Sequence, residues 1–308
     1  MPYRLITGDP DPAEVRRLTF VPFLPDGRCV LLPGPALPAG VVRDGEHYLL
    51  DASLRLPDLG FRAQRVHPFA RDGDHLYVWL DGDRVDDRPG VLVVDADEAA
   101  AELPVVRDAL TSFRTQTDAS YYADNVRLLE PAYLRGATPQ AGSGFGGDAA
   151  RWRSRRGMIV DGVHRDGTFL DVGCANGLLM ESVREWAAER GITLEPYGID
   201  LAPGLVELAR RRLPQWAGRI EEGNAIDWAP ADGRRFTFVH VLLDAVPRAR
   251  RADLIRHGLT LVEPGGRLLV SHYASASEPS AAEVLRELGF EPAGFSGPDA
   301  TTAWLGLS

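Results

Sequence analysis

The pattern with the clearest chemical meaning is a glycine turn followed by a single acid. The turn, Asp171-Val-Gly-Cys-Ala-Asn-Gly177, lies between a buried strand predicted at 168–173 and a helix predicted at 178–190. Asp200 closes the next predicted strand, 23 residues after the turn. Glycine lets a backbone approach a ligand closely, and a carboxylate in this place can accept both hydroxyls of a ribose. A lone glycine turn can be a plain strand-to-helix connection, but the second strand and its acid favour a nucleoside site.

The elements that position this turn form an alternating pattern. Apolar runs and amphipathic helical patterns alternate through the second half of the chain, which is typical of a parallel α/β sheet. Further strands are predicted at 192–200, 219–224, 236–242 and 267–273, helices at 204–213, 249–261 and 280–288, and a closing antiparallel pair at 290–295 and 301–307. The first half, with strands at 18–24, 29–33, 75–80 and 90–94 and helices at 48–59 and 98–113, has an α+β pattern.

Residues 148–308 resemble the class I S-adenosylmethionine-dependent methyltransferases on the glycine turn, the acid and the loop Gly223-Asn-Ala-Ile226. The resemblance implies a Rossmann-like sheet with helices on both faces and a last strand that inserts antiparallel. It implies S-adenosylmethionine as the cofactor, held by Asp171, Gly173, Cys174, Gly177, Asp200, Leu201, Asn224, Ala225 and Leu242.

Two positions depart from the family's pattern. The middle glycine of its first loop is here Ala175, whose methyl group is accommodated if φ is negative there. The usual aspartate of its adenine loop is Asn224, whose side-chain carbonyl can still accept a hydrogen bond from the adenine amine. Both departures are therefore compatible with cofactor binding.

The residues that act on the acceptor are harder to identify, because methyl transfer depends largely on holding nucleophile and methyl group in line. Asp244, after the fourth strand, is the candidate catalytic residue, with a capping or solvated carboxylate as the alternative. His272, after the fifth strand, and the aromatic pair Tyr121 and Tyr122 are candidate substrate residues, and core packing is the alternative for each.

Two further segments could take part. The segment 119–147 combines a helical piece with a glycine-rich stretch, so it is a connector or a lid. Next to it, Arg151, Arg153, Arg155 and Arg156 surround Trp152. Such a run usually forms a solvated helix face, and contact with an anionic acceptor is the sharper alternative.

The first domain, predicted at 1–118, resembles a degenerate Nudix domain. The resemblance rests on Leu37-Pro-Ala-Gly40, Gly45-Glu46 and the segment 54–61. Where that family carries paired glutamates for Mg²⁺, this chain has Arg55 and Leu59, which offer no hard oxygen ligand. A Nudix-like fold without hydrolase activity, used to bind a substrate or partner, is the hypothesis that follows, and an active diphosphate hydrolase is the alternative.

Composition limits the function classes. All 34 basic residues are arginine, which excludes chemistry that needs a lysine amine, and the net charge of −10 disfavours broad contact with nucleic acid or anionic membranes. Two cysteines and no long apolar run predict a cytoplasmic protein without a metal site or membrane segment. We therefore predict a methyltransferase acting on a small-molecule acceptor. A regulatory protein that binds the cofactor without turnover, and a nucleic-acid or protein methyltransferase, are the alternatives, and oligomeric state is left open.

Overall fold

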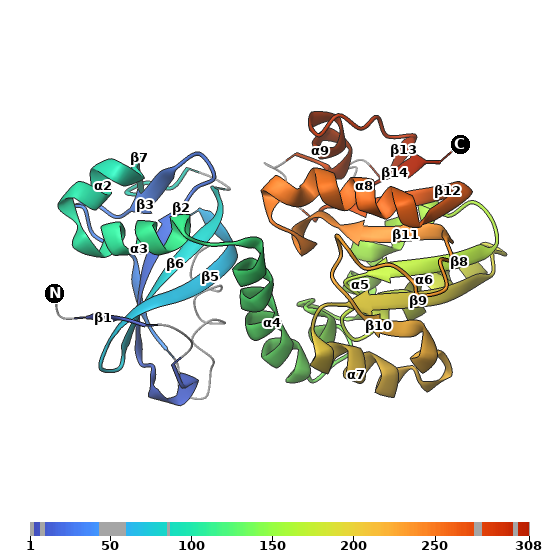
Figure 1. The fold of residues 1–308 in the computed structure, drawn as a ribbon, viewed down its shortest axis with the longest axis horizontal. Coiled ribbons are helices and arrows are strands. Elements are labelled where there is room, and N and C mark those ends of the chain that lie inside the picture. Colours follow the sequence, from blue (N-terminus) through green and yellow to red (C-terminus); the bar gives the residue numbers. More distant parts are fainter. Residues whose placement is uncertain are drawn as a thin grey trace. The chain divides into compact units, whose positions relative to one another are not determined.

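The computed structural model describes residues 3–6, 10–42, 60–84, 87–273, 279–297 and 301–307. The chain divides into two compact units, Met1–Asn125 and Val126–Ser308. Among the described residues, each unit has its own seven-stranded sheet (Figure 1). Within these residues no helix combines the length and the apolar character needed to cross a bilayer.

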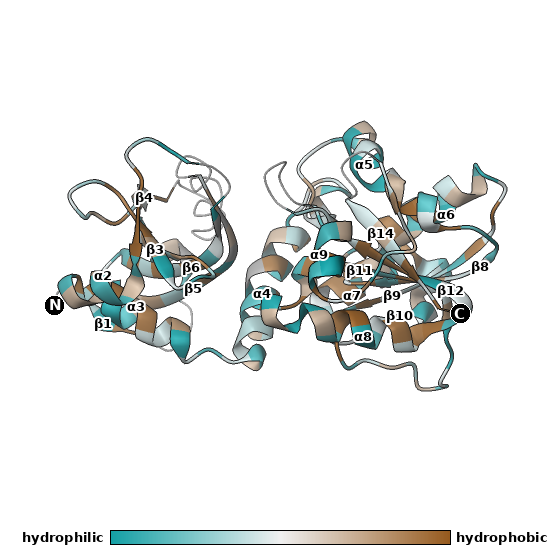
Figure 2. Ribbon diagram, turned by 90° about the horizontal axis from the view of Figure 1, so that it is seen from above, coloured by the Kyte–Doolittle hydropathy of each residue, from teal (hydrophilic) through white to brown (hydrophobic). Residues whose placement is uncertain are grey.

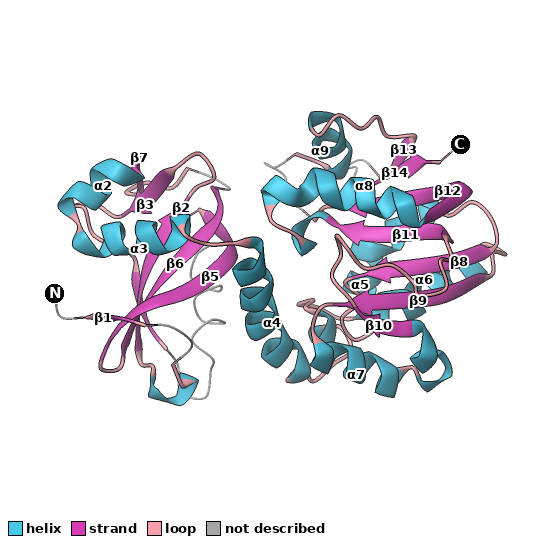
Figure 3. Cartoon of the chain, in the orientation of Figure 1, coloured by secondary structure: helices cyan, strands magenta, loops and turns pink. Residues whose placement is uncertain are grey.

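The first unit is a mixed sheet with helices on one face (Figure 3). Its strands are β1 (Arg4–Leu5), β2 (Arg17–Phe23), β3 (Arg28–Leu31), β4 (Ala39–Val41), β5 (Phe61–Asp72), β6 (His75–Arg84) and β7 (Leu92–Asp95), in the order β1-β5-β6-β2-β3-β7 with β4 paired to β2. The helices α2 (Ala96–Glu102) and α3 (Pro104–Arg114) pack their apolar sides on it. The predicted α+β pattern is confirmed here.

Three expectations for this unit had different outcomes. The single helix predicted at 98–113 is two helices, because Leu103 is extended and Pro104 starts a new helix. Strand β5 was missed, since two register shifts and Pro68 break its alternation of polar and apolar residues. The helix predicted at 48–59 and the Nudix-like residues between positions 43 and 59 lie outside the described residues, and Phe61 at the end of the Nudix-like segment begins β5.

A buried ion pair ties helix α4 (Asp118–Leu134) to this sheet. The Arg65 Nε atom donates to Asp124 at 2.8 Å, and His67 Nδ1 lies 3.0 Å from the same carboxylate. The Arg65 guanidinium carbon also lies 4.9 Å from the ring centroid of Trp79 and 5.4 Å from that of Tyr121. Arg65 and Asp124 are both buried, so each charge depends on the other.

The second unit is a mostly parallel sheet. Its strands are β8 (Gly167–Val172), β9 (Leu194–Asp200), β10 (Ile220–Glu222), β11 (Phe236–Leu242), β12 (Val262–Ser271), β13 (Gly294–Ser296) and β14 (Thr302–Gly306), in the order β10-β9-β8-β11-β12-β14-β13. The first five run parallel, and β14 is antiparallel to both of its neighbours. The predicted α/β sheet with an inserted antiparallel last strand is confirmed.

Helices cover both faces of this sheet. They are α5 (Ala149–Arg156), α6 (Leu178–Ala188), α7 (Pro203–Arg212), α8 (Arg251–Leu261) and α9 (Ala281–Glu287). Figure 2 shows α5 and α6 on one side of the strands and α8 on the other. Because both faces are covered, side chains on either face of the central strands are buried, as with Phe169 and Phe238 on one face and Leu170 and Val239 on the other.

We expect the Asp124→Asn substitution to destabilise the first unit by about 3–5 kcal/mol, because Arg65 would keep a buried charge without its counter-ion. Burial alone raises the pKa of Asp124, but bonding to His67 and Arg65 outweighs burial and holds it below its ordinary value. The stabilisation is therefore complete above about pH 4 and is lost as the pH falls through the lowered pKa.

Hydrogen exchange of β5 peptides in the full chain measures this effect. The exposed Glu102→Gln variant is the charge-matched control. Equal protection of β5 in the Asp124→Asn variant and the control would contradict the prediction.

Candidate functional site

The candidate site lies where the strand order reverses. Strand β8 connects forward to β9 on one side, whereas β11 lies on its other side, so the carboxyl ends of these strands open at a topological switch point. The loop Gly173–Gly177 joins β8 to α6 at this edge. Gly173, Ala175 and Gly177 have φ values of 84°, 47° and 77°, and Ala175 is the single non-glycine residue with positive φ in the described chain.

The condition set for accommodating Ala175, a negative φ, is therefore not met. The cause lies on the next strand: the Ala175 N–H donates to Asp200 Oδ2 at 2.8 Å, while Asp200 Oδ1 accepts the Ala202 N–H at 2.9 Å. Asp200 is buried, and burial raises the pKa of its carboxyl although the two backbone donors act in the opposite direction. This carboxylate thus holds a strained residue in place.

The two glycines of the loop do different work. A side chain at Gly173 would extend into space with no atom within 4 Å, whereas one at Gly177 would lie 2.6 Å from Leu213. Gly173 therefore leaves room for a ligand, and Gly177 allows α7 to pack closely. The Cys174 side chain is fully buried between them, and burial raises the pKa of its thiol, which suits packing and not nucleophilic chemistry.

A chain of buried polar side chains crosses four strands at the same edge. Asp171 Oδ1 lies 2.8 Å from His240 Nδ1, His240 Nε2 lies 3.0 Å from Ser271 Oγ, and that hydroxyl lies 3.0 Å from Thr302 Oγ1. Asp171 Oδ2 is buried without a hydrogen-bond partner in the described part of the chain. These hydrogen bonds hold the Asp171 side chain in place and leave its Oδ2 atom able to accept a hydrogen bond from a further donor.

Residues outside the predicted site contact the loop or the start of α7. Asn176 Nδ2 donates to the Pro139 carbonyl at 2.8 Å, so the glycine-rich stretch contacts the loop. Glu130 Oε2 accepts the Gly204 N–H at 3.2 Å at the start of α7, and Tyr133 packs against Ala175. These residues were missed, because their partners lie 37 to 74 positions away along the chain.

The other predicted cofactor residues lie around this edge. Asn224 Oδ1 accepts the Ile226 N–H at 3.2 Å and so shapes its own loop, and the Gly223 N–H donates to the Asp200 carbonyl at 2.9 Å. The remaining three, Leu201, Ala225 and Leu242, are partly exposed. Their contact with a cofactor stays a prediction.

Two of the predicted acceptor-side residues lie together. His272 is buried after β12, and its Nδ1 atom is 3.8 Å from Asp244 Oδ1. Asp244 Oδ1 also accepts a hydrogen bond from Arg251 Nη2 at 2.6 Å. The Asp244 side chain is 35% exposed, so the paired carboxylate still reaches solvent.

The aromatic pair belongs to the first unit. Tyr121 and Tyr122 are buried, with ring centroids 5.6 Å apart, and Tyr121 packs on Arg65. Packing against Tyr122 and Arg65 is therefore sufficient to explain why Tyr121 is buried. A substrate role for the pair stays a prediction.

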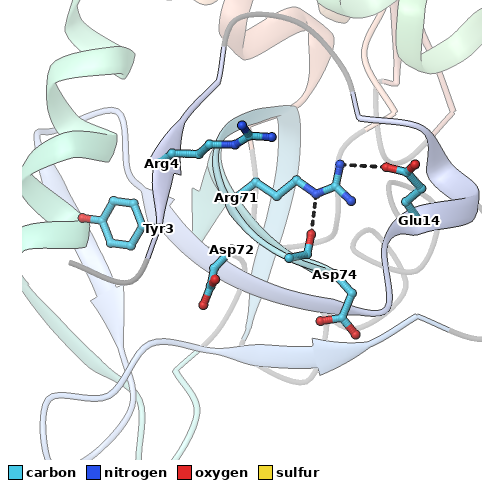
Figure 4. Close-up of a pocket in the computed structure, with 7 residues that line it drawn as sticks. Tyr3, Arg4, Glu14, Arg71, Asp72 and Asp74 are labelled. Atoms are coloured by element: carbon cyan, nitrogen blue, oxygen red, sulfur yellow. Dashed lines mark hydrogen bonds and ion pairs between the residues drawn. The ribbon is translucent and has the colours of Figure 1, made fainter.

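The first unit also carries a hollow of about 650 Å³ (Figure 4). Arg71 lies in it, with Nη1 2.9 Å from Glu14 Oε2 and Nε 2.5 Å from the Gly73 carbonyl oxygen. Asp72 and Asp74 line the same hollow. Within the described ranges no group of three or more histidine, cysteine, aspartate or glutamate residues is arranged to hold a metal ion.

Comparison with known proteins gives one family match. Residues 169–266 match the family model described as a methyltransferase domain, which covers less than half of the chain. No curated protein matches.

Among solved structures, the chain is similar to a sugar N-methyltransferase from Streptoalloteichus (23% identity, 42% of this chain, 49% of that chain, TM-score 0.33). It is also similar to a methyltransferase from Thiobacillus denitrificans in complex with S-adenosylhomocysteine (19% identity, 48% of this chain, 54% of that chain, TM-score 0.31). A third similar structure is magnesium protoporphyrin IX methyltransferase from Synechocystis with bound S-adenosylmethionine (15% identity, 63% of this chain, 99% of that chain, TM-score 0.43). The matches span about half the length of the first two structures.

The strain at Ala175 leads to a pair of predicted stabilities. Ala175→Gly removes about 1–2 kcal/mol of left-handed strain but loses about 0.8 kcal/mol of methyl burial and about 0.5–1 kcal/mol of chain entropy, so stability changes by less than about 1 kcal/mol. Ala175→Val places a β-branched residue at positive φ and should cost about 2 kcal/mol or more. Urea unfolding followed by circular dichroism measures both, and equal stability of the two variants would show that the loop relaxes to negative φ.

Proposed function

We propose that the second unit binds S-adenosylmethionine at the carboxyl ends of β8 and β9 and transfers its methyl group to a small-molecule acceptor. The observation that carries the proposal is the loop Gly173–Gly177 at the switch point of the sheet, in which Asp200 bonds to Ala175 at its positive φ. The family match over residues 169–266 supports the same reaction.

The residues present fit this cofactor. The open space over Gly173 admits a ligand to the backbone, and the unpartnered Asp171 Oδ2 is a buried acceptor for the ammonium group of an amino acid. Each Asp200 oxygen accepts one backbone N–H and keeps a lone pair for a ribose hydroxyl. Asn224, Ala225, Leu201 and Leu242 would surround the adenine side.

The protein's contribution to the reaction is mainly positional. The bound cofactor supplies an electrophilic methyl group on a sulfonium centre, which a nucleophile attacks in line. Asp200 and the hydrogen-bonded side chains of Asp171, His240, Ser271 and Thr302 fix the backbone that would hold the cofactor. Asp244, beside His272, is our candidate to take a proton from an acceptor that must lose one.

Two alternatives remain, one in which the cofactor is bound but not consumed and one in which the acceptor is a nucleic acid. A regulatory protein would bind S-adenosylmethionine without consuming it in the presence of any acceptor. A nucleic-acid methyltransferase is disfavoured by the net charge of −10.

The free, buried Cys29 and Cys174 favour a reducing, cytoplasmic location.

The first prediction of this proposal concerns ligand binding. Asp200→Ala should weaken S-adenosylhomocysteine binding by about 1–3 kcal/mol, because a charge-assisted acceptor of the ribose and the anchor of Ala175 are both removed. In calorimetry, Glu222→Ala, an exposed acid paired in register with Asp200, should bind as the unaltered chain does. Asp244→Asn, placed on the acceptor side, should also leave the affinity unchanged.

The same assay tests the function itself. At about 100 times the dissociation constant, S-adenosylhomocysteine should add about 2.7 kcal/mol to the stability of the unaltered chain. A chain that gains no stability from S-adenosylhomocysteine or S-adenosylmethionine would not be a methyltransferase of this class. Unchanged affinity in a folded Asp200→Ala protein would remove Asp200 from the site.

The second prediction concerns the first unit, which we propose binds a substrate or partner without hydrolysis. Between residues 47 and 61 the sequence offers two acids, Asp51 and Asp58, with Pro57 between them, too few to gather Mg²⁺. The full chain with Mg²⁺ should therefore leave nucleoside diphosphate sugars and nucleoside triphosphates intact. Phosphate release that disappears in Glu46→Gln would establish a hydrolase.

A further inference from the structure

The hollow of the first unit brings two arginines together. Arg4 on β1 and Arg71 on β5 are direct partners in the antiparallel register of these strands. Side chains directly opposite each other lie on the same face of a sheet, with Cβ atoms about 4.5–5.5 Å apart, and two like charges in this arrangement repel. Figure 4 shows both guanidinium groups on the side of the hollow where Glu14 lies. The hollow therefore gathers positive charge, which destabilises this strand pair unless anions offset it.

Glu14 offsets the charge of one of the two arginines. Its Oε2 atom accepts from Arg71 Nη1 at 2.9 Å, and the Gly73 carbonyl accepts from Arg71 Nε at 2.5 Å. The Arg71 side chain is 19% exposed, so this partly buried cation depends on Glu14. Arg4 is exposed, and no hydrogen bond or ion pair joins its guanidinium to any residue that the structure describes. Within the described part of the chain, Arg4 thus has no counter-ion.

The other two acids of the hollow do not supply that counter-ion. Asp74 is paired with Arg17, whose Nη2 atom donates to Asp74 Oδ1 at 2.7 Å. Asp72 follows Arg71 directly on β5, and successive side chains of a strand point to opposite faces. In Figure 4 the carboxylates of Asp72 and Asp74 point away from the two guanidinium groups. On the arginine side of the hollow, two cations therefore face one carboxylate.

We propose that this hollow binds a small molecule through a carboxylate group, an inference that rests on the proposed binding role of the first unit. The planar fork of a guanidinium matches the two oxygens of a carboxylate, and the N–H groups of Arg4 have no acceptor among the described residues. One negative charge balances the cation that lacks a counter-ion, whereas a doubly charged phosphate would place an excess charge beside Glu14. A volume of about 650 Å³ lies within the range of small-molecule sites, so the body of such a ligand also has room.

Benzoate and its uncharged amide, benzamide, test the charge requirement. In ligand-observed NMR titrations of the full chain at low salt, benzoate should bind at least about 10-fold more tightly than benzamide. S-adenosylhomocysteine is added in excess throughout, so that the site proposed in the second unit is occupied. Equal affinity for the two probes, or no binding of benzoate, would overturn the proposal.

Three single substitutions locate the binding. Arg4→Met should weaken benzoate binding at least about 10-fold, because the cation without a counter-ion is removed. Glu14→Gln should strengthen it about 2- to 5-fold, since a competing carboxylate is lost. Arg16→Met, which removes an exposed arginine of the same unit that does not line the hollow, should leave the affinity unchanged. All three side chains are exposed, so none of the substitutions removes a core contact.

Each contrary result has a distinct meaning. Unchanged affinity in Arg4→Met would place benzoate elsewhere and overturn the site. An equal loss in Arg4→Met and Arg16→Met would also overturn it, because general charge attraction would then explain the binding. Tighter binding of inorganic phosphate than of benzoate would overturn the carboxylate assignment in favour of a phosphate ligand. A failure of S-adenosylhomocysteine to bind would overturn the methyltransferase function of the second unit and leave this comparison of probes intact.

Discussion

The geometry of the candidate site depends on one buried carboxylate. Asp200 accepts the N–H of Ala175 from the loop after β8 and the N–H of Ala202 at the start of α7. Its own carbonyl accepts the N–H of Gly223, which follows β10. Three connections at the carboxyl edge of the sheet are therefore fixed by one residue. Ala175 keeps its unfavourable φ because this hydrogen bond is formed in a buried place, where an unmet N–H would be costly.

Polar atoms inside the second unit are concentrated at that same edge. A sheet covered by helices on both faces buries its strands, so polar side chains are tolerated where they bond to one another. Asp171, His240, Ser271 and Thr302 meet this condition across β8, β11, β12 and β14. This row of hydrogen-bonded side chains ends at Asp171 Oδ2, which has no hydrogen-bond partner among the described residues. Such an atom in an otherwise satisfied network suits a site that a ligand completes.

The first unit is organised around a different buried charge. Arg65 is held by Asp124 from α4 and by the ring of Trp79 from β6, so a helix that continues into the second unit is anchored to this sheet. The net gain in stability from an ion pair of this kind is small, because the cost of desolvating two charges offsets much of their attraction, whereas removing one partner is costly. The same chemistry, a guanidinium against aromatic rings, recurs at Arg156, whose guanidinium carbon lies 3.4 Å from the ring centroid of Tyr273.

The sequence by itself determined the α/β alternation, the glycine turn with its acid and the antiparallel last strand, because hydrophobic periodicity and glycine placement are local signals. It did not determine the sign of φ at Ala175, which depends on an acceptor 25 residues away, nor the hydrogen bond of Asn176 to Pro139. Four arginines in six positions looked equivalent along the chain, and the fold separated Arg156 from the rest by placing Tyr273 over it. Tertiary structure decided these features because burial and the identity of a partner are properties of residues that meet in space, and no local pattern encodes which distant side chain arrives.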